Sequence, residues 1–565
     1  MRPPRSPRAA LRELQRLRLA FGPNAAARKR RLIHALERAR LDSATAVLAF
    51  HEALCFARAY PDDRATLRAV ERALVRFARR ADLRRHRAAL ADSGIAGAAI
   101  HYRFFAETTK WLARRWPKQL RIEWGELGDA PLLEALLPLL AAFAETPGLD
   151  ELDYGLRGWI DRMKSDGETD AAFLIRSLER LVPDAFLHEK LVDVMDVPFV
   201  LESGHGTPSR TLAVAARAPL AFQRRPLATH RPDLRAEIAR PPRSVRALSE
   251  REGARLIDLA RAAMVTRSRD LDVFAYGDPR DVRMVDCGEG LAFVCIGAEP
   301  ERRLLLESVY GYLTLKNGVP VGYVLTSTLY GSAELAYNVF ETFRGAEAAP
   351  IFARMLAMTR HLFGCDTFTI VPYQLGGDGN EEGLASGAWW FYRKLGFEPR
   401  HAGARRLMHA EEARMRRRPG HRSSRATLER LAAHNVYFSA GRPRADVMGL
   451  LPLPRAGLAA TRMLSRRFGA DRERAEDACE RVALGRLRAT RMTGWSADQR
   501  MAWRRWAPLV TLLPGLERWS AGEKYALIEV VRAKGGRRES EFVRAFDAHA
   551  KLRAALAKLI RGTPE

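Results

Sequence analysis

Apolar residues along this chain recur at two different spacings, and the change from one spacing to the other divides the sequence. From residue 1 to about residue 200, and again from 431 to 565, they return every three or four positions, which is typical of amphipathic helices. Residues 244–412 instead contain short runs rich in β-branched and aromatic residues, interleaved with helical patterns. That mixture predicts an α+β domain between two helical regions.

Glycine and proline mark the connections between these regions. The stretch from Ser203 to Pro242 is rich in both, and a second, strongly basic stretch contains Pro419-Gly420; such stretches are typical of linkers. We therefore predict a multidomain protein of α and α+β class. The predicted regions are a helical, all-α N-terminal region (1–202), a linker or irregular connection (203–243), a central domain with a mixed β-sheet flanked by helices (244–412), an exposed basic connector (413–430) and a helical, all-α C-terminal region (431–565).

Within the central domain, the order of elements begins with a strand and a helix and continues as a meander. Val245 to Leu248 predicts the first strand, and a helix follows it. Two β-rich runs, 309–315 and 319–329, flank Lys316-Asn317-Gly318, and Asn-Gly between such runs is a strong signal for a hairpin. Glu334 to Phe340 predicts the next strand.

The residues after Phe340 carry the most informative pattern in the chain. The turn Arg344-Gly345 leads into a helical pattern, Ile351 to Leu362, that Gly364 ends. An apolar run, Phe368 to Val371, predicts the next strand, and a second helix covers Ala388 to Leu395. Strand–helix–strand connectivity implies a right-handed crossover and a parallel pair of strands. An Arg-Gly turn before a helix also suits the capture of phosphate, because unpaired N–H groups and the positive end of the helix dipole face it.

Two of these motifs resemble the GNAT superfamily of N-acetyltransferases. Arg344-Gly345 stands where that family has its Arg-Gly-rich loop for the acyl-CoA pyrophosphate, and Phe391 to Phe397 resembles its Tyr-x-Lys-x-Gly-Phe signature. The resemblance covers only the central region, about residues 243–412. The family pattern has further glycines after Arg-Gly, whereas this chain has Ala346-Glu347-Ala348.

The resemblance implies a transfer of an acyl group, most simply acetyl, from acetyl-CoA or another acyl-CoA to an amine. It implies that backbone groups of Arg344, Gly345 and Ala346 hold the pyrophosphate. Val339 or Phe340 would donate an N–H to the thioester oxygen. Tyr392 would be the acid that protonates the departing thiolate; it can equally be a core residue beneath the sheet.

The base and one further cofactor contact are less specific in the sequence. Glu334, at the start of a predicted strand, and Glu341, near its end, are the candidate bases, and either can be a solvated strand residue. Asn380 lies in the loop where the family often has an Asn at the cofactor arm. The run Gly376 to Asn380 is also simply a glycine-rich loop.

Composition then bears on partners and compartment. The formal net charge is +27, which favours anionic partners such as CoA, nucleic acid or acidic protein. The five cysteines are scattered without a CxxC pair, so we expect a cytoplasmic protein with no disulfide framework and no metal site. No apolar run reaches the roughly 20 residues that span a bilayer. Arg414 to Arg418 is the candidate nucleic-acid contact, or else a solvated linker.

Three functions therefore compete. The first is an acyl-CoA-dependent N-acyltransferase with an unknown amine or protein acceptor. The second is a catalytically degenerate GNAT-like scaffold or sensor, which Glu347 in place of glycine favours. The third is a basic nucleic-acid-binding protein, for which the tryptophans of the C-terminal region would have to be exposed as stacking platforms.

Overall fold

The computed structural model describes residues 6–228, 231–488 and 492–563. The protein is multidomain, with about 55% helix and a large mixed sheet. Contacts divide it into two compact units: unit 1 comprises 1–227, 255–276 and 316–320, and unit 2 comprises 228–254, 277–315 and 321–565. The chain therefore passes between the units after residue 227, within the helix α13 (Glu250–Val265), after residue 276, and on both sides of the tip of one hairpin.

Unit 1 is mostly helical but contains a small sheet. Its helices are α1 (Pro7–Arg16), α2 (Pro23–Arg38), α3 (Ala44–Ala59), α4 (Arg64–Val75), α5 (Ala81–Arg85), α6 (Ala106–Arg115), α7 (Pro131–Leu140), α8 (Thr146–Glu151), α9 (Gly155–Met163), α10 (Asp170–Leu181), α11 (Ala185–Met195) and α14 (Asp272–Ala275). The strands β1 (Ile100–Tyr102), β2 (Leu120–Ile122) and β3 (Phe199–Leu201) pair antiparallel in the order β1-β3-β2. The expectation of an all-α N-terminal region was therefore wrong, because three-residue strands are too short to show alternation.

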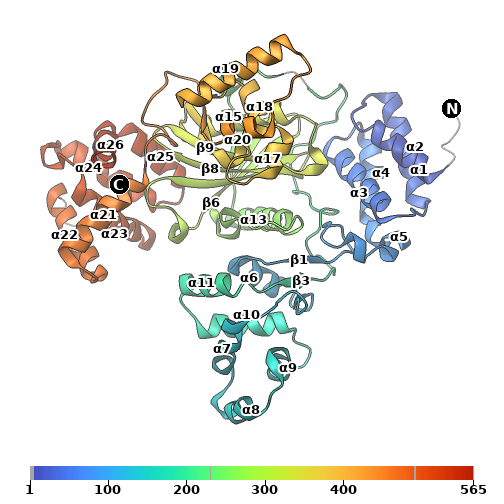
Figure 1. The fold of residues 1–565 in the computed structure, drawn as a ribbon, viewed down its shortest axis with the longest axis horizontal. Helices are drawn as coiled ribbons and strands as arrows, with labels where there is room; N and C mark the ends of the chain where they lie inside the picture. The colour runs from blue at the N-terminus through green and yellow to red at the C-terminus, as the bar shows by residue number, and fades with distance from the viewer. Residues whose placement is uncertain (1–5, 229–230, 489–491, 564–565) are drawn as a thin grey trace. The chain divides into compact units, whose positions relative to one another are not determined.

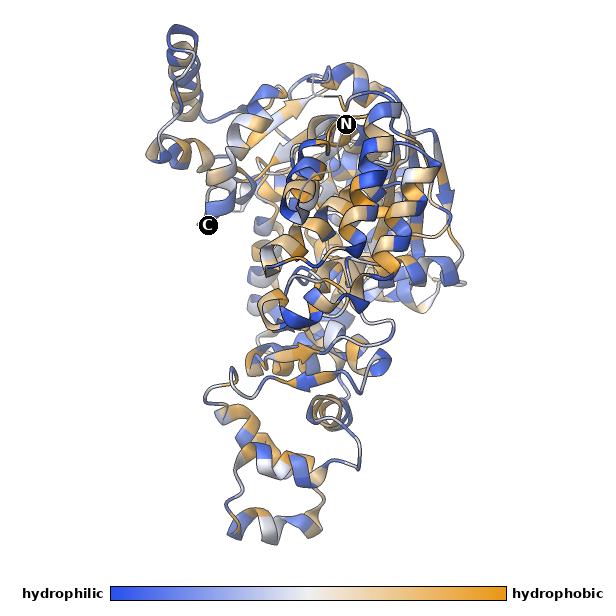
Figure 2. Cartoon of the chain, turned by 90° about the vertical axis from the view of Figure 1, so that its right-hand side faces the viewer, coloured by the Kyte–Doolittle hydropathy of each residue, from blue (hydrophilic) through white to orange (hydrophobic). Residues whose placement is uncertain are grey.

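One segment of unit 1 differs in charge from the rest of the chain. Residues 123–153, which include α7 and α8, contain eight acidic and no basic residues, whereas the whole chain carries +27. Apolar side chains in this segment lie open to solvent, and Phe143 is 91% exposed. Figure 2 colours these helices by hydropathy and shows hydrophobic residues alternating with hydrophilic ones along them.

Unit 2 is built on a nine-stranded sheet. Its strands are β4 (Ser244–Ala247), β5 (Gly277–Gly288), β6 (Leu291–Ala298), β7 (Ser308–Lys316), β8 (Val319–Leu329), β9 (Ser332–Val339), β10 (Thr367–Ile370), β11 (Glu398–Pro399) and β12 (Val436–Ser439). They lie in the order β11-β12-β10-β9-β8-β7-β6-β5-β4. The predicted hairpin around Asn317-Gly318 is confirmed as β7 and β8. The predicted parallel pair is confirmed as β9 and β10.

Helices cover this sheet and extend it. They are α12 (Leu234–Ala239), α15 (Ala348–Phe363), α16 (Pro372–Leu375), α17 (Glu381–Ser386), α18 (Ala388–Lys394), α19 (Ala402–Arg417), α20 (Arg425–Ala432), α21 (Pro454–Phe468), α22 (Arg472–Leu487), α23 (Ala497–Leu512), α24 (Ala521–Lys534), α25 (Glu539–Ala548) and α26 (Ala550–Gly562). Figure 1 shows α15, α18, α19 and α20 on one face of the sheet, and α21 to α26 gathered at one end of unit 2.

Three of the predicted regions differ from the structure in unit 2. The predicted linker 203–243 contains α12, whose Leu234 and Ile238 are buried in the core that includes α15. The predicted connector 413–430 is largely helical, because α19 runs to Arg417 and α20 begins at Arg425. The predicted all-α region 431–565 contains β12, which lies between β10 and β11. α12, α20 and β12 have only six, eight and four residues, too few to carry a clear period of their own, whereas α19 has 16 residues and simply continues beyond the predicted boundary at 412.

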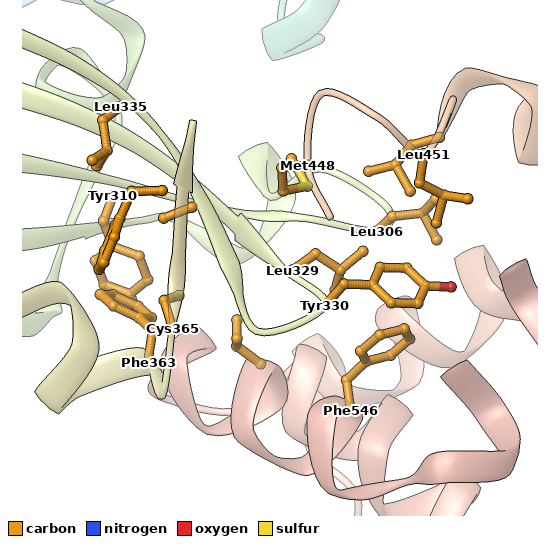
Figure 3. Close-up of a cluster of buried hydrophobic side chains, with 14 of the residues drawn as sticks. Leu306, Tyr310, Leu329, Tyr330, Leu335, Phe363, Cys365, Met448, Leu451 and Phe546 are labelled. Carbon is orange, nitrogen blue, oxygen red and sulfur yellow. The ribbon is translucent and has the colours of Figure 1, made fainter. Parts of the chain in front are cut away.

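One apolar core joins the sheet to the C-terminal helices. Figure 3 shows Tyr330, at the turn between β8 and β9, lying against Phe546 of α25, with ring centroids 5.1 Å apart. Phe363 of α15 packs edge-on against Tyr310 of β7 at 4.9 Å. The C-terminal helices therefore belong to the same folding unit as the sheet.

Buried polar groups reinforce this connection, and we call Asp281, Tyr310, Lys534 and Glu539 the Asp281 junction. The Asp281 carboxylate on β5 accepts a hydrogen bond from the Tyr310 hydroxyl, and that hydroxyl accepts one from the Ser540 N–H at 2.9 Å. The Lys534 ammonium lies 2.5 Å from the Glu539 carboxylate, and both side chains are buried. The Lys534 ammonium also donates to the Glu307 carbonyl at 3.0 Å.

In the described residues, no single helix is long and apolar enough to cross a bilayer. By length and composition alone, α7 and the segment 143–151 reach that limit together, with a bend of 112° between them.

Removing one charge of the Asp281 junction should destabilise unit 2. We expect Lys534→Met to lower its free energy of unfolding by about 3–5 kcal/mol, because Glu539 is left buried without a counter-charge. The double variant Lys534→Met/Glu539→Leu should recover most of this loss. Denaturant unfolding followed by tryptophan fluorescence measures both.

Lys551→Met is the matched control, since Lys551 forms an ion pair with Glu523 that is half exposed. It should change stability by less than about 1 kcal/mol. Equal losses in the Lys534 and Lys551 variants would show that the buried pair has no special role.

Candidate functional site

The parallel strands β9 and β10 run together for only a short distance. Their register pairs Ser332, Ala333 and Glu334 with Thr367, Phe368 and Thr369. β10 ends at Ile370, whereas β9 continues to Val339. Five residues of β9, roughly 16 Å at about 3.3 Å per residue, therefore extend beyond the registered pairs.

The backbone of β9 divides its hydrogen-bonding groups between the two sides of the strand. The Phe340 N–H donates to the Val321 carbonyl at 3.0 Å, in line with the register of β9 on β8. Because successive residues of a strand point their N–H groups to opposite sides, the Val339 N–H is directed toward the side on which β10 has ended. The expectation for Phe340 as a donor to a ligand was therefore wrong, whereas the geometry is compatible with Val339.

The predicted pyrophosphate loop forms a tight turn before α15. Gly345 has a φ of 78°, and a Cβ added there would meet nothing within 4 Å. The N–H groups of Arg344 and Ala346 donate to the carbonyls of Glu341 and Phe343 at 3.1 and 3.3 Å. These two groups are engaged within the turn, so they do not provide the ligand contacts that the resemblance implied.

Charged side chains surround this turn. The Arg344 guanidinium forms an ion pair with the Glu382 carboxylate of α17 and donates to the Val339 carbonyl at 3.4 Å. Glu347 is the N-cap residue of α15 and is nearly buried. It therefore places a negative charge at the helix end where an anion would bind.

Glu334 lies on the sheet face opposite α15. On β9, Tyr337 points toward the helix, since its ring packs on Phe352 and its hydroxyl donates to the Ala348 carbonyl at 3.1 Å. Side chains alternate between the faces, so Glu334 points away from α15. It lies in register with Ser327 and Thr369, and Thr369 lies in register with Tyr437.

The environment of Glu334 favours its protonated form. Burial raises the pKa of this carboxyl group, and the nearby Glu307 carboxylate adds to the rise. In the described part of the chain, its side chain has no ion pair with Lys, Arg or His. A carboxyl group without a counter-charge, placed on a polar row, is a candidate proton acceptor.

Glu341 is placed differently from the prediction. It lies beyond β9, in the short 3-10 turn Glu341–Phe343, and it is exposed to solvent. The strand ends at Val339 because the chain turns there toward α15. A fully solvated carboxylate outside the strand has no feature that marks it as a base.

Tyr392 sits in an aromatic cluster. Its ring lies 5.5 Å from that of Phe352 and 5.8 Å from that of Phe397, and the residue is buried. Burial raises the pKa of the phenol well above its usual value. The hydroxyl therefore keeps its proton at neutral pH, as an acid requires, while the ring serves as core.

Asn380 has a structural role that accounts for both ends of its amide. Its carbonyl oxygen accepts from the Gly383 N–H at 3.0 Å and caps α17. Its amide group donates to the Tyr373 carbonyl at 2.7 Å. A contact with a cofactor arm would have to replace one of these bonds.

The tryptophans and the basic stretch, on which nucleic-acid binding would depend, lie in different environments. Trp495, Trp503, Trp506 and Trp519 are all buried, so they cannot stack on nucleic-acid bases. Arg414 lies in α19 and pairs with Glu411 at 2.5 Å, whereas Arg416, Arg417 and Arg418 are exposed. In the part of the chain that the structure describes, no group of three or more His, Cys, Asp or Glu side chains is arranged to hold a metal ion.

Comparison of the chain with known protein families, with curated proteins and with solved structures finds no match. The assignment of a function therefore depends on the geometry of unit 2 alone.

The raised pKa of Glu334 leads to a prediction for stability against pH. Because its folded-state pKa lies above the ordinary value of 4.5, the folded state binds this proton more tightly than the unfolded state. The protein therefore loses stability as pH rises from about 4.5 through the folded-state pKa. Glu334→Gln should unfold at a higher temperature than the wild type at pH 8, and the difference should vanish at pH 4.

Glu341→Gln is the control, since its carboxylate is exposed. Thermal unfolding at both pH values measures the effect. A Glu334→Gln variant less stable than the wild type at pH 8 would contradict the placement of Glu334 in an uncompensated, buried environment.

Proposed function

We propose that unit 2 is an acyl-CoA-dependent N-acyltransferase with a GNAT-like fold, which transfers an acyl group, most simply acetyl, directly from the thioester to an amine. The observation that carries this proposal is the parting of β9 from β10 beside the N-terminus of α15. The order strand, helix, meander, strand, helix, strand, helix in residues 244–394 supports it.

The geometry supports a path for the cofactor. A pyrophosphate beside Gly345 would meet the positive end of the α15 dipole and the Arg344 guanidinium, displacing Glu382 from its ion pair. An extended arm running back along the unpaired edge of β9 would pass Val339. Its reactive end would then approach Leu335, next to Glu334.

Two residues would supply the two proton transfers that the reaction needs, Glu334 from the sheet face away from α15 and Tyr392 from the side that packs on Phe352 of α15. Glu334, with its raised pKa, would take a proton from the attacking amine, directly or through water. The amine nitrogen then bonds to the thioester carbon, and the carbon–sulfur bond breaks. Tyr392, protonated at neutral pH, would give its proton to the departing thiolate. The Val339 N–H would stabilise the negative charge on the carbonyl oxygen.

A second candidate is a scaffold or sensor of the same fold that has lost catalysis. Glu347 at the N-cap of α15, and the engagement of the Arg344 and Ala346 N–H groups within the turn, favour it. Cofactor binding separates the transferase from a scaffold, and turnover separates it from a sensor that binds acyl-CoA without reacting.

Acetyl-CoA should bind the wild-type protein measurably in isothermal titration calorimetry at low salt. Arg344→Ala should weaken the binding by about 10- to 100-fold, because one charge-assisted contact is worth about 1.5–3 kcal/mol. Arg360→Ala, in the last turn of the same helix, is the matched control and should bind as the wild type does. Absence of binding heat would refute the transferase.

Tyr392→Phe tests the acid. Turnover with acetyl-CoA and an amine acceptor should fall by about 10² or more, while the affinity for acetyl-CoA and the unfolding temperature stay unchanged. Tyr373→Phe is the control, because Tyr373 is exposed. Full activity in Tyr392→Phe would assign this residue to the core alone.

A further inference from the structure

A wide-open pocket of about 860 Å³ lies along α26, and nothing in the proposed transferase uses it. One of its walls is the face of α26 that carries Ala554, Ala557, Lys558 and Arg561, and the others include Asp446 and Asp547. We call it the α26 cavity. Its volume falls within the range of sites for small molecules, about 300–1,000 Å³.

The two carboxylates of the α26 cavity are already matched by an arginine. The Arg553 guanidinium lies 2.7 Å from the Asp446 carboxylate and 3.9 Å from that of Asp547. Asp547 also accepts a hydrogen bond from the Gly331 N–H at 2.8 Å. These acids therefore orient Arg553 rather than present unopposed negative charge.

Two further cationic side chains of the cavity have no carboxylate partner within the described residues. Lys558 and Arg561, both exposed, line the cavity and form no ion pair within the described residues. Cations in the last turn of a helix also complement its dipole, but that effect does not require a hollow beside them. Four alanines, Ala445, Ala550, Ala554 and Ala557, line the hollow, and no aromatic side chain does.

The wall of the cavity is fixed to the sheet. The Arg444 guanidinium donates to the Tyr330 carbonyl at 2.8 Å and lies 3.3 Å from the Asp446 carboxylate. The same guanidinium lies 2.7 Å from Asp366, the residue before β10. The Tyr330 hydroxyl donates to the Arg553 carbonyl at 3.2 Å. Arg553 is therefore a fixed part of the wall, and the cations left for a ligand are Lys558 and Arg561.

We propose that the α26 cavity binds a small organic phosphate, with the phosphate group between Lys558 and Arg561 and the remainder of the ligand over the four alanines. The excess of cations selects an anion, and the lack of aromatic side chains excludes recognition of a base by stacking. The size of the hollow excludes a nucleic-acid duplex. The site is independent of the acyl-CoA path along β9.

Titration of the full-length protein with glycerol 3-phosphate, and separately with inorganic pyrophosphate, tests this site at constant ionic strength. We expect saturable binding, with an increase in the unfolding temperature. Lys558→Ala/Arg561→Ala should weaken binding at least 10-fold, while Lys551→Ala, on the same helix outside the cavity, should not. Tighter binding of glycerol 3-phosphate than of pyrophosphate would identify an organic phosphate as the ligand.

A second variant separates a built site from general attraction to a basic protein. Ala554→Trp fills the hollow without changing any charge, so it should abolish saturable binding. Arg344→Ala should leave this binding intact and weaken only acetyl-CoA, so failure of the transferase and failure of this site are distinguishable. Absence of saturable binding, or its persistence in Ala554→Trp, would overturn the proposal.

Discussion

A buried ion pair between Lys534 and Glu539 governs how unit 2 is assembled. Its charges are buried where α24 and α25 lie against β5 and β7, and there the Glu539 N–H donates to the Asp281 carboxylate and the Ser540 N–H to the Tyr310 hydroxyl. Partial assembly would leave a charge or a hydroxyl buried without a partner, which costs several kcal/mol. The sheet and the C-terminal helices therefore form one cooperative unit, and the apolar contact of Tyr330 with Phe546 reinforces it.

Contacts within unit 2 fix the first residues of the two strands that form the candidate acyl-transfer site. The turn at Tyr330-Gly331 and the residue Asp366 precede β9 and β10, and Arg444 contacts both. Because Arg444 holds the first residues of β9 and β10 close together, these strands share three registered pairs before they part. The parting depends on where the chain leaves β10 through α16, so a short β10 next to a longer β9 is the local cause of the proposed cofactor path.

The sequence predicted those elements whose pattern is local. The Asn317-Gly318 turn identified its hairpin, and the periodic run before Gly364 identified α15, because turn chemistry and helical spacing act within a few residues. It did not predict β12, which is four residues long and takes its place in the sheet from pairing with β10, more than 60 residues away. Among the site residues, the sequence placed Glu334 and Tyr392 on their elements, but the hydrogen bonds of Asn380, Phe340 and Ala346 depend on turns that no motif encodes.

The acidic segment 123–153 gives unit 1 an uneven charge distribution. A chain of net charge +27 is drawn toward any polyanionic surface, yet this segment is pushed away from it. On such a surface unit 1 would turn the acidic segment and the bare Phe143 ring away from the polyanion. An evenly distributed charge of the same total would leave all orientations equally populated.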